Sequence, residues 1–218
     1  MSGLFEALRQ VADLGGPVVM VLIGVSVVAT ATVLYKIWQF GAAGVGRHKA
    51  LAEAVAAWDR GDRSGARAAL DRSTSYLAPV IEMAFVSGAE DEGRLRAEAE
   101  TRFARLEAGF RLLDSVVQLS PLLGLFGTVL GMIEAFQSLQ QAGTQVDPSL
   151  LAGGIWVALL TTAVGLAVAM PTALVLSWLE GRMDAERVTA ERAIATVLYP
   201  HGGWNAEASH SDPVTAGA

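Results

Sequence analysis

The stretch Ser120-Pro-Leu-Leu-Gly-Leu-Phe-Gly-Thr-Val-Leu-Gly-Met132 decides the fold of this chain. It lies in an apolar segment, residues 112–139, and a helix needs only about 20 apolar residues to cross a bilayer. The stretch nevertheless holds three glycines, a proline and a threonine, which a simple lipid anchor does not need. Small residues in a membrane helix let another backbone approach closely. The segment is therefore predicted to pack against protein.

A second apolar segment, residues 150–179, repeats this design. In both segments small residues recur at spacings of three and four, which places each set on one helical face. The predicted stripes are Ser120, Gly124, Thr128, Gly131 and Ala135 in the first segment and Gly154, Ala158, Thr162, Gly165 and Ala169 in the second, with Gly127 as a further packing position.

Each segment also carries a proline toward one end, Pro121 and Pro171, which we interpret as helix bends. Thr128 lies roughly 10 Å beyond the first proline along the helix, and Thr162 roughly 13 Å beyond the second. If the prolines lie at similar depth, two antiparallel helices each offer a hydroxyl near mid-membrane. The simpler alternative is that the stripes only pack helices and the threonines bond their own backbone carbonyls. Likewise, the prolines can set a bend without acting as hinges.

Composition supports a membrane protein and argues against several other classes. The chain is 52% hydrophobic and only 17% charged, too apolar for an ordinary soluble domain. It has no cysteine, and its three histidines are scattered, so we expect no metal site and no cofactor. The net charge of −6 gives no reason to expect nucleic-acid binding. No nucleophile–base pair or phosphate-binding loop is evident, so we expect no enzymatic activity.

The fold expected from these patterns is an all-α integral membrane protein with three transmembrane helices and long helical extensions. A continuous helix is predicted from near residue 90 to residue 139, and the third span is expected to continue to about residue 194. A signal peptide is the alternative for the first span, but Glu6 and Asp13 precede it. The expected segments are 1–16 (amphipathic), 17–38 (span one), 39–111 (helical insert), 112–139 (span two), 140–149 (loop), 150–179 (span three), 180–199 (helical extension) and 200–218 (disordered tail).

The distribution of basic residues predicts the orientation. Twelve lysines and arginines occur from Lys36 to Arg111, and three more follow the third span, whereas the loop 140–149 has none. The positive-inside rule therefore places the N-terminus outside and both the insert and the C-terminus in the cytoplasm.

Two motifs resemble a known family. The stretch 120–132, followed by Ala135-Phe136, is similar to the second-helix signature of the MotA/TolQ/ExbB proton channel family. Ala158-Leu-Leu-Thr-Thr-Ala-Val-Gly-Leu-Ala-Val-Ala-Met-Pro171 is similar to its third-helix signature. Three spans with a helical insert between the first two match the ExbB/TolQ branch.

The resemblance implies a bacterial inner-membrane subunit that couples proton-motive force to work in the periplasm or at the outer membrane. It implies a homopentamer around a dimer of an ExbD/TolR-like single-span partner that carries a membrane aspartate, with a TonB/TolA-like protein as a further candidate partner. The matching threonines, Thr128 and Thr162, would face that aspartate, with Thr161 as a neighbouring hydroxyl.

The sequence departs from the family at one position. Many ExbB and TolQ proteins carry a glutamate where this chain has Val157. The acids nearest the spans here are Asp114 and Glu134, and we assign Glu134 to ion entry, with an interfacial carboxylate as the alternative. Without the glutamate, proton binding would fall on the partner aspartate, and sodium coupling stays open. A second hypothesis is a non-conducting membrane scaffold, which the missing glutamate favours.

Overall fold

The computed structural model describes residues 2–142 and 148–201, with side chains described for residues 16–141, 149 and 151–201. Within these ranges the chain forms helices and no strands. The chain divides into two compact units. Residues 1–35 and 109–179 form the first, here the apolar unit, and residues 36–108 and 180–218 form the second, here the polar unit. The expected loop and tail lie largely outside the described residues, at 143–147 and 202–218.

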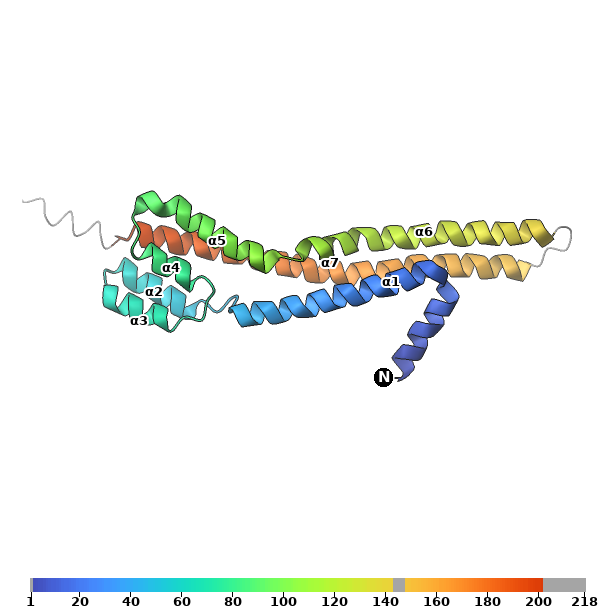
Figure 1. The fold of residues 1–218 in the computed structure, drawn as a ribbon, viewed down its shortest axis with the longest axis horizontal. Coiled ribbons are helices and arrows are strands. Elements are labelled where there is room, and N and C mark those ends of the chain that lie inside the picture. The colour runs from blue at the N-terminus through green and yellow to red at the C-terminus, as the bar shows by residue number, and fades with distance from the viewer. Residues whose placement is uncertain (1, 143–147, 202–218) are drawn as a thin grey trace, which may run out of the picture. The chain divides into compact units, whose positions relative to one another are not determined.

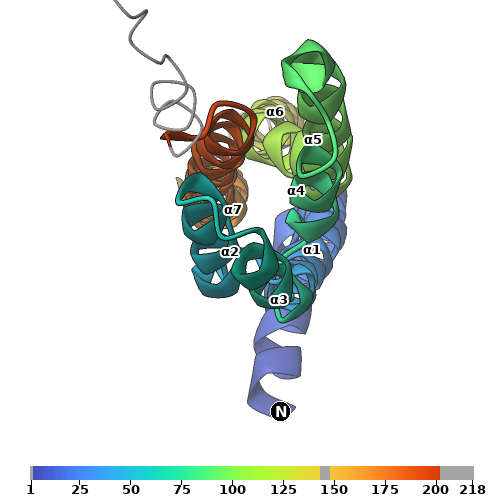
Figure 2. The same cartoon turned by 90° about the vertical axis from the view of Figure 1, so that its left-hand side faces the viewer.

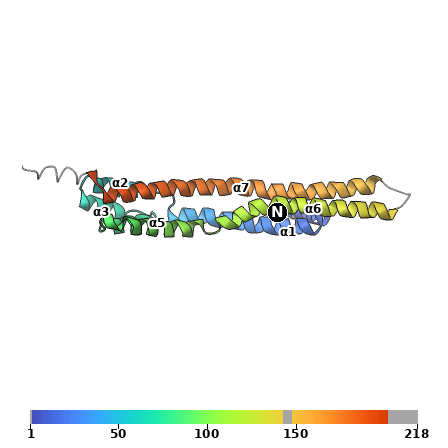
Figure 3. The ribbon, with the colours of Figure 1, turned by 90° about the horizontal axis from the view of Figure 1, so that it is seen from above.

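Three helices supply the membrane-length segments, as predicted. They are α1 (Ser2–Ala43), α6 (Phe110–Ala142) and α7 (Pro148–Leu198). Each contains a stretch long and apolar enough to cross a bilayer, within Gly16–Ala43, Phe110–Gln141 and Leu151–Leu198. Within the apolar unit, α6 runs alongside the first half of α7 in both Figure 1 and Figure 3. The fold class expected from the sequence is therefore confirmed.

Helix α1 contains a sharp bend at Gly16, where the backbone has φ 66° and ψ −166°. Glycine has no Cβ and adopts such positive φ values readily, and Pro17 then fits the first turn of the following helix. The bend, visible in Figure 1, falls at the expected border between the segment 1–16 and the first span. The backbone of residues 2–15 is helical, but the side chains that would make it amphipathic lie outside the description.

The predicted continuous helix from residue 90 to residue 139 is wrong. Helix α5 (Glu92–Glu107) ends before α6 begins, because Ala108 is extended, with ψ 123°, and Gly109 has φ 97°. A single glycine can be tolerated inside a helical pattern. Its left-handed backbone instead terminates α5, which is the common role of a glycine just past a helix end.

The end of α5 is capped by side chains from the end of α1. The Nζ of Lys36 donates to the carbonyl oxygen of Leu106 at 3.0 Å, and the Nε2 of Gln39 lies 3.4 Å from the carbonyl oxygen of Arg105. The last carbonyls of a helix have no partner within it, so these bonds replace the missing ones. Lys36 is only 2% exposed, so its side chain is buried within the polar unit.

The polar unit consists of short helices packed around the second half of α7. Helices α2 (Lys49–Asp59) and α3 (Arg63–Asp71) form a hairpin within the expected helical insert, with Gly61 at φ 85° in the turn. Helix α4 (Ala78–Ala84) and a short 3₁₀ helix (Ala89–Asp91) lead into α5. Figure 2 shows α2 and α3 side by side with α4 next to them. The expected extension of the third span is confirmed, since α7 continues without interruption to Leu198.

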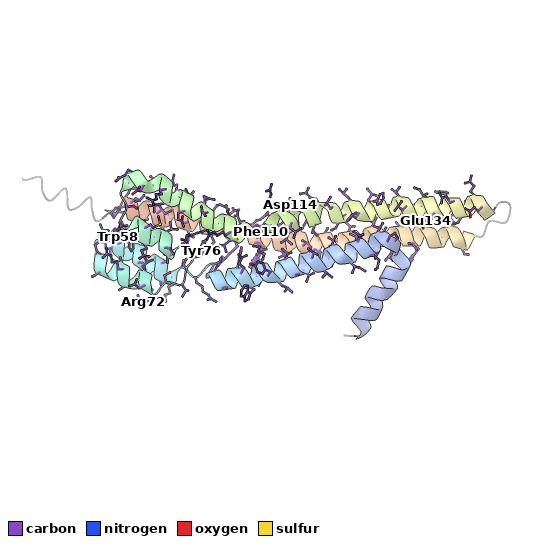
Figure 4. The ribbon with its side chains drawn as sticks, viewed as in Figure 1. Trp58, Arg72, Tyr76, Phe110, Asp114 and Glu134 are labelled. Atoms are coloured by element: carbon purple, nitrogen blue, oxygen red, sulfur yellow. The ribbon has the colours of Figure 1, made fainter. Side chains whose placement is uncertain are left out.

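Trp58 anchors this unit, and Figure 4 marks its position on α2. Its ring stacks on Phe85 with 4.1 Å between centroids and 5° between planes, and its Nε1 donates to the carbonyl oxygen of Val197 at 3.0 Å. An aromatic side chain buried in this way combines a large apolar contact with a satisfied polar atom. The contact fixes α2 against the end of α7.

Candidate functional site

The predicted small-residue faces of α6 and α7 meet in a closely packed seam, here called the α6–α7 seam. A methyl group added at Gly124 would lie 2.9 Å from the carbonyl oxygen of Thr161 and 3.0 Å from the Cα of Thr162. A methyl added at Gly165 would lie 2.5 Å from the carbonyl oxygen of Ser120 and 3.1 Å from the Cα of Gly124. These neighbours are backbone atoms, which cannot move aside as a side chain can. The seam therefore requires glycine at both positions.

The same packing continues toward the other end of the two helices. A methyl at Gly131 would approach the Cβ of Ala158 to 3.1 Å, and one at Gly154 would approach the Cβ of Ala135 to 2.6 Å. Ala158 and Ala135 are themselves buried, as is Ala169. The predicted packing residues that meet at the seam are Gly124, Gly131 and Ala135 of α6 and Gly154, Ala158 and Gly165 of α7.

Thr161 and Thr162 lie at the middle of the seam and both reach α6. The hydroxyl of Thr162 donates to the carbonyl oxygen of Gly124 at 3.1 Å. The hydroxyl of Thr161 lies 3.2 Å from that oxygen and 2.7 Å from the carbonyl oxygen of Ala158. Thr161 is 2% exposed, and a methyl at Gly127 would come within 2.6 Å of its hydroxyl oxygen. Gly127 thus makes room for Thr161.

Thr128 differs from these two residues. Its hydroxyl donates to the carbonyl oxygen of Leu125 in its own helix at 2.6 Å and makes no bond across the seam among the described residues. This is the local bonding weighed as the simpler alternative for all the threonines. Thr128 is half-buried, so its side chain stands beside the seam and not within it.

The facing pairs fix the relative depth of the threonines. Gly131 faces Ala158 and Gly127 faces Thr161, so residue 128 lies opposite residue 160 or 161. Thr128 and Thr162 are therefore within about 3 Å of the same level along the helix axes. The prolines are less well matched, because Pro171 lies about 5 Å beyond the level of Pro121. Both prolines are accommodated inside continuous helices, and their role as bends stays a prediction.

The carboxylates of α6 lie outside the seam. Asp114 and Glu134 are both exposed, near opposite ends of the helix in Figure 4, and the Oδ2 of Asp114 accepts a hydrogen bond from Gln118 at 2.7 Å. Glu134 lines a cavity of about 200 Å³ together with Ser138, Gly153 and Val157. The valine that replaces the family glutamate thus lines the same cavity as the carboxylate assigned to ion entry. Within the seam, the described residues supply hydroxyls and carbonyls but no titrating group.

A second polar cluster lies in the polar unit, around Glu186. Its carboxylate is buried, with 4% of the side chain exposed. It receives hydrogen bonds from the hydroxyl of Tyr76 at 2.8 Å, from the backbone N–H of Gly46 at 2.8 Å and from the Nε2 of His48 at 2.7 Å. The Nδ1 of His48 in turn lies 3.1 Å from the hydroxyl of Ser75. The cluster joins α7 to the segments on both sides of the α2–α3 hairpin.

The hydrogen bonds decide the protonation of this cluster. Burial of the Glu186 carboxylate raises its pKa, but the bonds from His48 and Tyr76 outweigh burial, so the pKa of Glu186 lies below its usual value. Burial and the bond to Glu186 both raise the pKa of the Tyr76 hydroxyl, which stays protonated. The sequence did not predict this cluster. His48 belongs to no recognisable motif, and Glu186 lies within a segment that was predicted only to be helical.

A second link within the polar unit joins α5 to α7. The Arg187 guanidinium donates to both carboxylate oxygens of Glu107, with Nη2 at 3.1 Å from Oε2, and lies over the ring of Phe103 at 5.2 Å from its centroid. These hydrogen bonds raise the pKa of Arg187, so its charge is fixed. Among the described residues no group of three or more histidine, aspartate or glutamate side chains is arranged to hold a metal ion.

Comparison with known proteins extends the likeness seen in the motifs. Residues 86–192 match the model of the MotA/TolQ/ExbB proton channel family. A putative biopolymer transport protein, ExbB-like 3, of Synechocystis is 32% identical over 166 residues, covering 73% of this chain and 79% of that protein. A putative ExbB homologue of Methanothermobacter thermautotrophicus is 32% identical over 57% of this chain and 46% of its own length. The TolQ protein of the Tol-Pal system of Haemophilus influenzae is 40% identical over 37% of this chain and 35% of its own length. The chain thus spans less than half the length of the archaeal relative.

Proposed function

The chain belongs to the MotA/TolQ/ExbB proton channel family, and we propose that it is the multi-pass subunit of an inner-membrane motor driven by proton-motive force. In this proposal it works with a single-span ExbD/TolR-like partner, as a homopentamer around a partner dimer, and has no enzymatic activity. The basic residues support an orientation with the insert and the C-terminus in the cytoplasm.

One observation carries the proposal: two hydroxyls lie at mid-span in a seam whose described residues include no carboxylate. Thr161 and Thr162 both lie within hydrogen-bond distance of the Gly124 carbonyl oxygen, where two membrane-length helices touch. Hydroxyls and carbonyls can hydrogen-bond an ion or a carboxylic acid, but they do not titrate near neutral pH. Reversible proton binding at this depth therefore needs a carboxylate from another chain, which a partner aspartate would supply.

Glu134 has a different place in this proposal. It lies about one to two turns beyond Thr128 on α6 and lines a small cavity with Ser138. A carboxylate in that position can attract cations to one end of the proposed ion pathway. It need not be the group that binds and releases the proton during transport. These positions support two separate roles, in which Glu134 attracts the ion and the threonine hydroxyls line the ion pathway at mid-span.

The first test is purification in mild detergent, followed by mass spectrometry of the proteins that co-purify at a fixed ratio. Recovery of a small single-span protein with a membrane aspartate supports the motor. A homo-oligomer alone, or a partner without that aspartate, contradicts it.

The second test separates transport from assembly. With the complex in proteoliposomes, Thr162→Val is expected to abolish proton uptake while leaving the complex intact. Thr172→Val is the matched control, since its hydroxyl bonds the carbonyl oxygen of Val168 in its own helix.

The alternative is a non-conducting scaffold, and Val157 is the observation that favours it. A scaffold would use the α6–α7 seam solely to hold other membrane proteins. In that case Thr162→Val would leave the driven process unchanged, or would reduce it only in proportion to the loss of the assembled complex.

A further inference from the structure

A narrow apolar groove runs between α1 and α6 in the apolar unit, here called the α1–α6 groove. Residues 21–28 of α1 form one wall and residues 112–123 of α6 form the other, and they border an open groove of about 450 Å³. This volume falls in the range of about 300–1,000 Å³ that is typical of ligand sites. On the α1 side Gly24 leaves the groove open, since a methyl group there would meet no atom within 4 Å.

The length of the groove matches one leaflet of a bilayer. Residues 112 and 123 are eleven residues apart, or about 16 Å along α6. The hydrocarbon core of a bilayer is about 30 Å thick, so the groove is about as long as one leaflet is thick. Its walls are hydrocarbon apart from the Ser115 hydroxyl, which already donates to the carbonyl oxygen of Arg111 at 2.9 Å.

The width of the groove distinguishes the possible occupants. A helix with side chains is at least about 10 Å across, so a helix of a second copy could cover the open side of the groove but would be too wide to lie within it. An extended hydrocarbon chain is the component of a membrane narrow enough to fill it.

A positively charged residue, Arg111, lies at one end of the groove. Arg111 precedes the groove residue Leu112 and lies one turn before Ser115 on the same helical face. Its side chain is exposed, and among the described residues its guanidinium has no ion-pair partner. The nearby carboxylate of Asp114 is hydrogen-bonded by Gln118 instead.

We propose that the α1–α6 groove binds one acyl chain of an anionic phospholipid whose phosphate is held at Arg111. The site is separate from the α6–α7 seam and does not depend on the proposed motor function. The lipid would fill the gap beside Gly24 and complete the packing of α1 on α6. It therefore acts as a structural ligand of the apolar unit.

The test uses the full chain, with any partner that co-purifies, in nanodiscs that contain equal amounts of dioleoyl phosphatidylglycerol and dioleoyl phosphatidylcholine. Native mass spectrometry then counts each lipid retained per protomer. We expect phosphatidylglycerol to be retained about fivefold over phosphatidylcholine, as one cation near a membrane surface favours an anionic lipid. Equal retention of the two lipids by the wild-type protein would contradict the assignment of the headgroup to Arg111.

Two substitutions with matched controls complete the test. Gly24→Leu fills the groove and is expected to reduce retained lipid several-fold, whereas Gly41→Leu, an open position on the same helix, leaves it unchanged. Arg111→Gln is expected to keep the lipid but remove the preference for phosphatidylglycerol, whereas Arg94→Gln keeps both. Unchanged retention in Gly24→Leu overturns the proposal.

A photo-reactive residue in place of Val28 gives a readout that does not depend on filling the groove. Protein–lipid adducts enriched in phosphatidylglycerol support the proposal. Cross-linked protein dimers at this position show that a second copy covers the groove, and overturn it. Helicity by circular dichroism confirms that each variant is folded before its lipid is counted.

Discussion

The hydroxyl of Thr162 lies 3.1 Å from the carbonyl oxygen of Gly124, so α7 donates a hydrogen bond to the backbone of α6. This contact is possible because Gly124 has no side chain to hold the helices apart. In a regular helix this carbonyl oxygen accepts the backbone N–H of Thr128, and its second lone pair is free to accept a hydroxyl from the neighbouring helix. The seam is thus closed by backbone contact and by side-chain hydrogen bonds.

Gly124→Ala is expected to destabilise the apolar unit by about 1–3 kcal/mol, because the new methyl group would meet backbone atoms at 2.9 and 3.0 Å. Gly153→Ala on α7 is the control, since its methyl group meets no atom within 4 Å. There alanine should be neutral or stabilise the helix by up to about 1 kcal/mol. Reversible denaturation in mixed micelles measures both, and equal effects of the two substitutions would contradict the seam.

Thr161→Val and Thr162→Val are each expected to lower the free energy of unfolding by only about 0.6 kcal/mol, the average for interhelical hydrogen bonds in membranes. Valine keeps the shape of threonine and removes the donor. Thr128→Val should change stability no more than this, since its bond is local. A loss above about 3 kcal/mol for Thr162→Val would mean that the residue is needed for assembly, and would undermine its use to separate transport from assembly.

Gly109→Ala is expected to cost about 1–2 kcal/mol, because the φ of 97° at this position is unfavourable for a residue with a Cβ. Gly93→Ala in α5 should have the opposite sign, since it replaces a helical glycine with open space around it. Thermal unfolding followed by circular dichroism tests both. A stabilised Gly109→Ala variant would mean that α5 and α6 join into one helix at little cost.

Acid is expected to weaken the polar unit through Glu186. The folded-state pKa of this carboxylate is lowered from the ordinary value of 4.5, so its stabilising contribution is complete above about pH 4.5 and is lost as the pH falls through the lower folded value. Glu186→Gln should reduce stability at pH 7 and flatten the decline between pH 5 and pH 3. The comparison is with Glu191→Gln, an exposed position on α7, by thermal melts at each pH. Parallel pH curves for Glu186→Gln and wild type would contradict this prediction.

Sequence patterns predicted the apolar unit well because its packing follows helical repeats. The spacing of Gly124, Gly131, Ala158 and Gly165 sufficed to place them on two facing stripes. The break at Gly109 was missed because a glycine in a helical pattern is compatible with both a helix and a helix end. The Glu186 cluster could not be predicted, since His48 and Tyr76 are brought to it by the tertiary fold of the hairpin region. Thr161 was ranked below Thr128 because spacing alone does not tell a residue in a seam from one beside it.

The backbone contact between Gly124 and Gly165 also limits how this molecule can move. Two surfaces separated by side chains can slide by changing rotamers, but two backbones in direct contact have no such slack. Rotation of α6 against α7 would drive carbonyl groups into Cα atoms at the seam. The two helices therefore form a rigid element, and any motion of the apolar unit has to take place on surfaces other than the one they share.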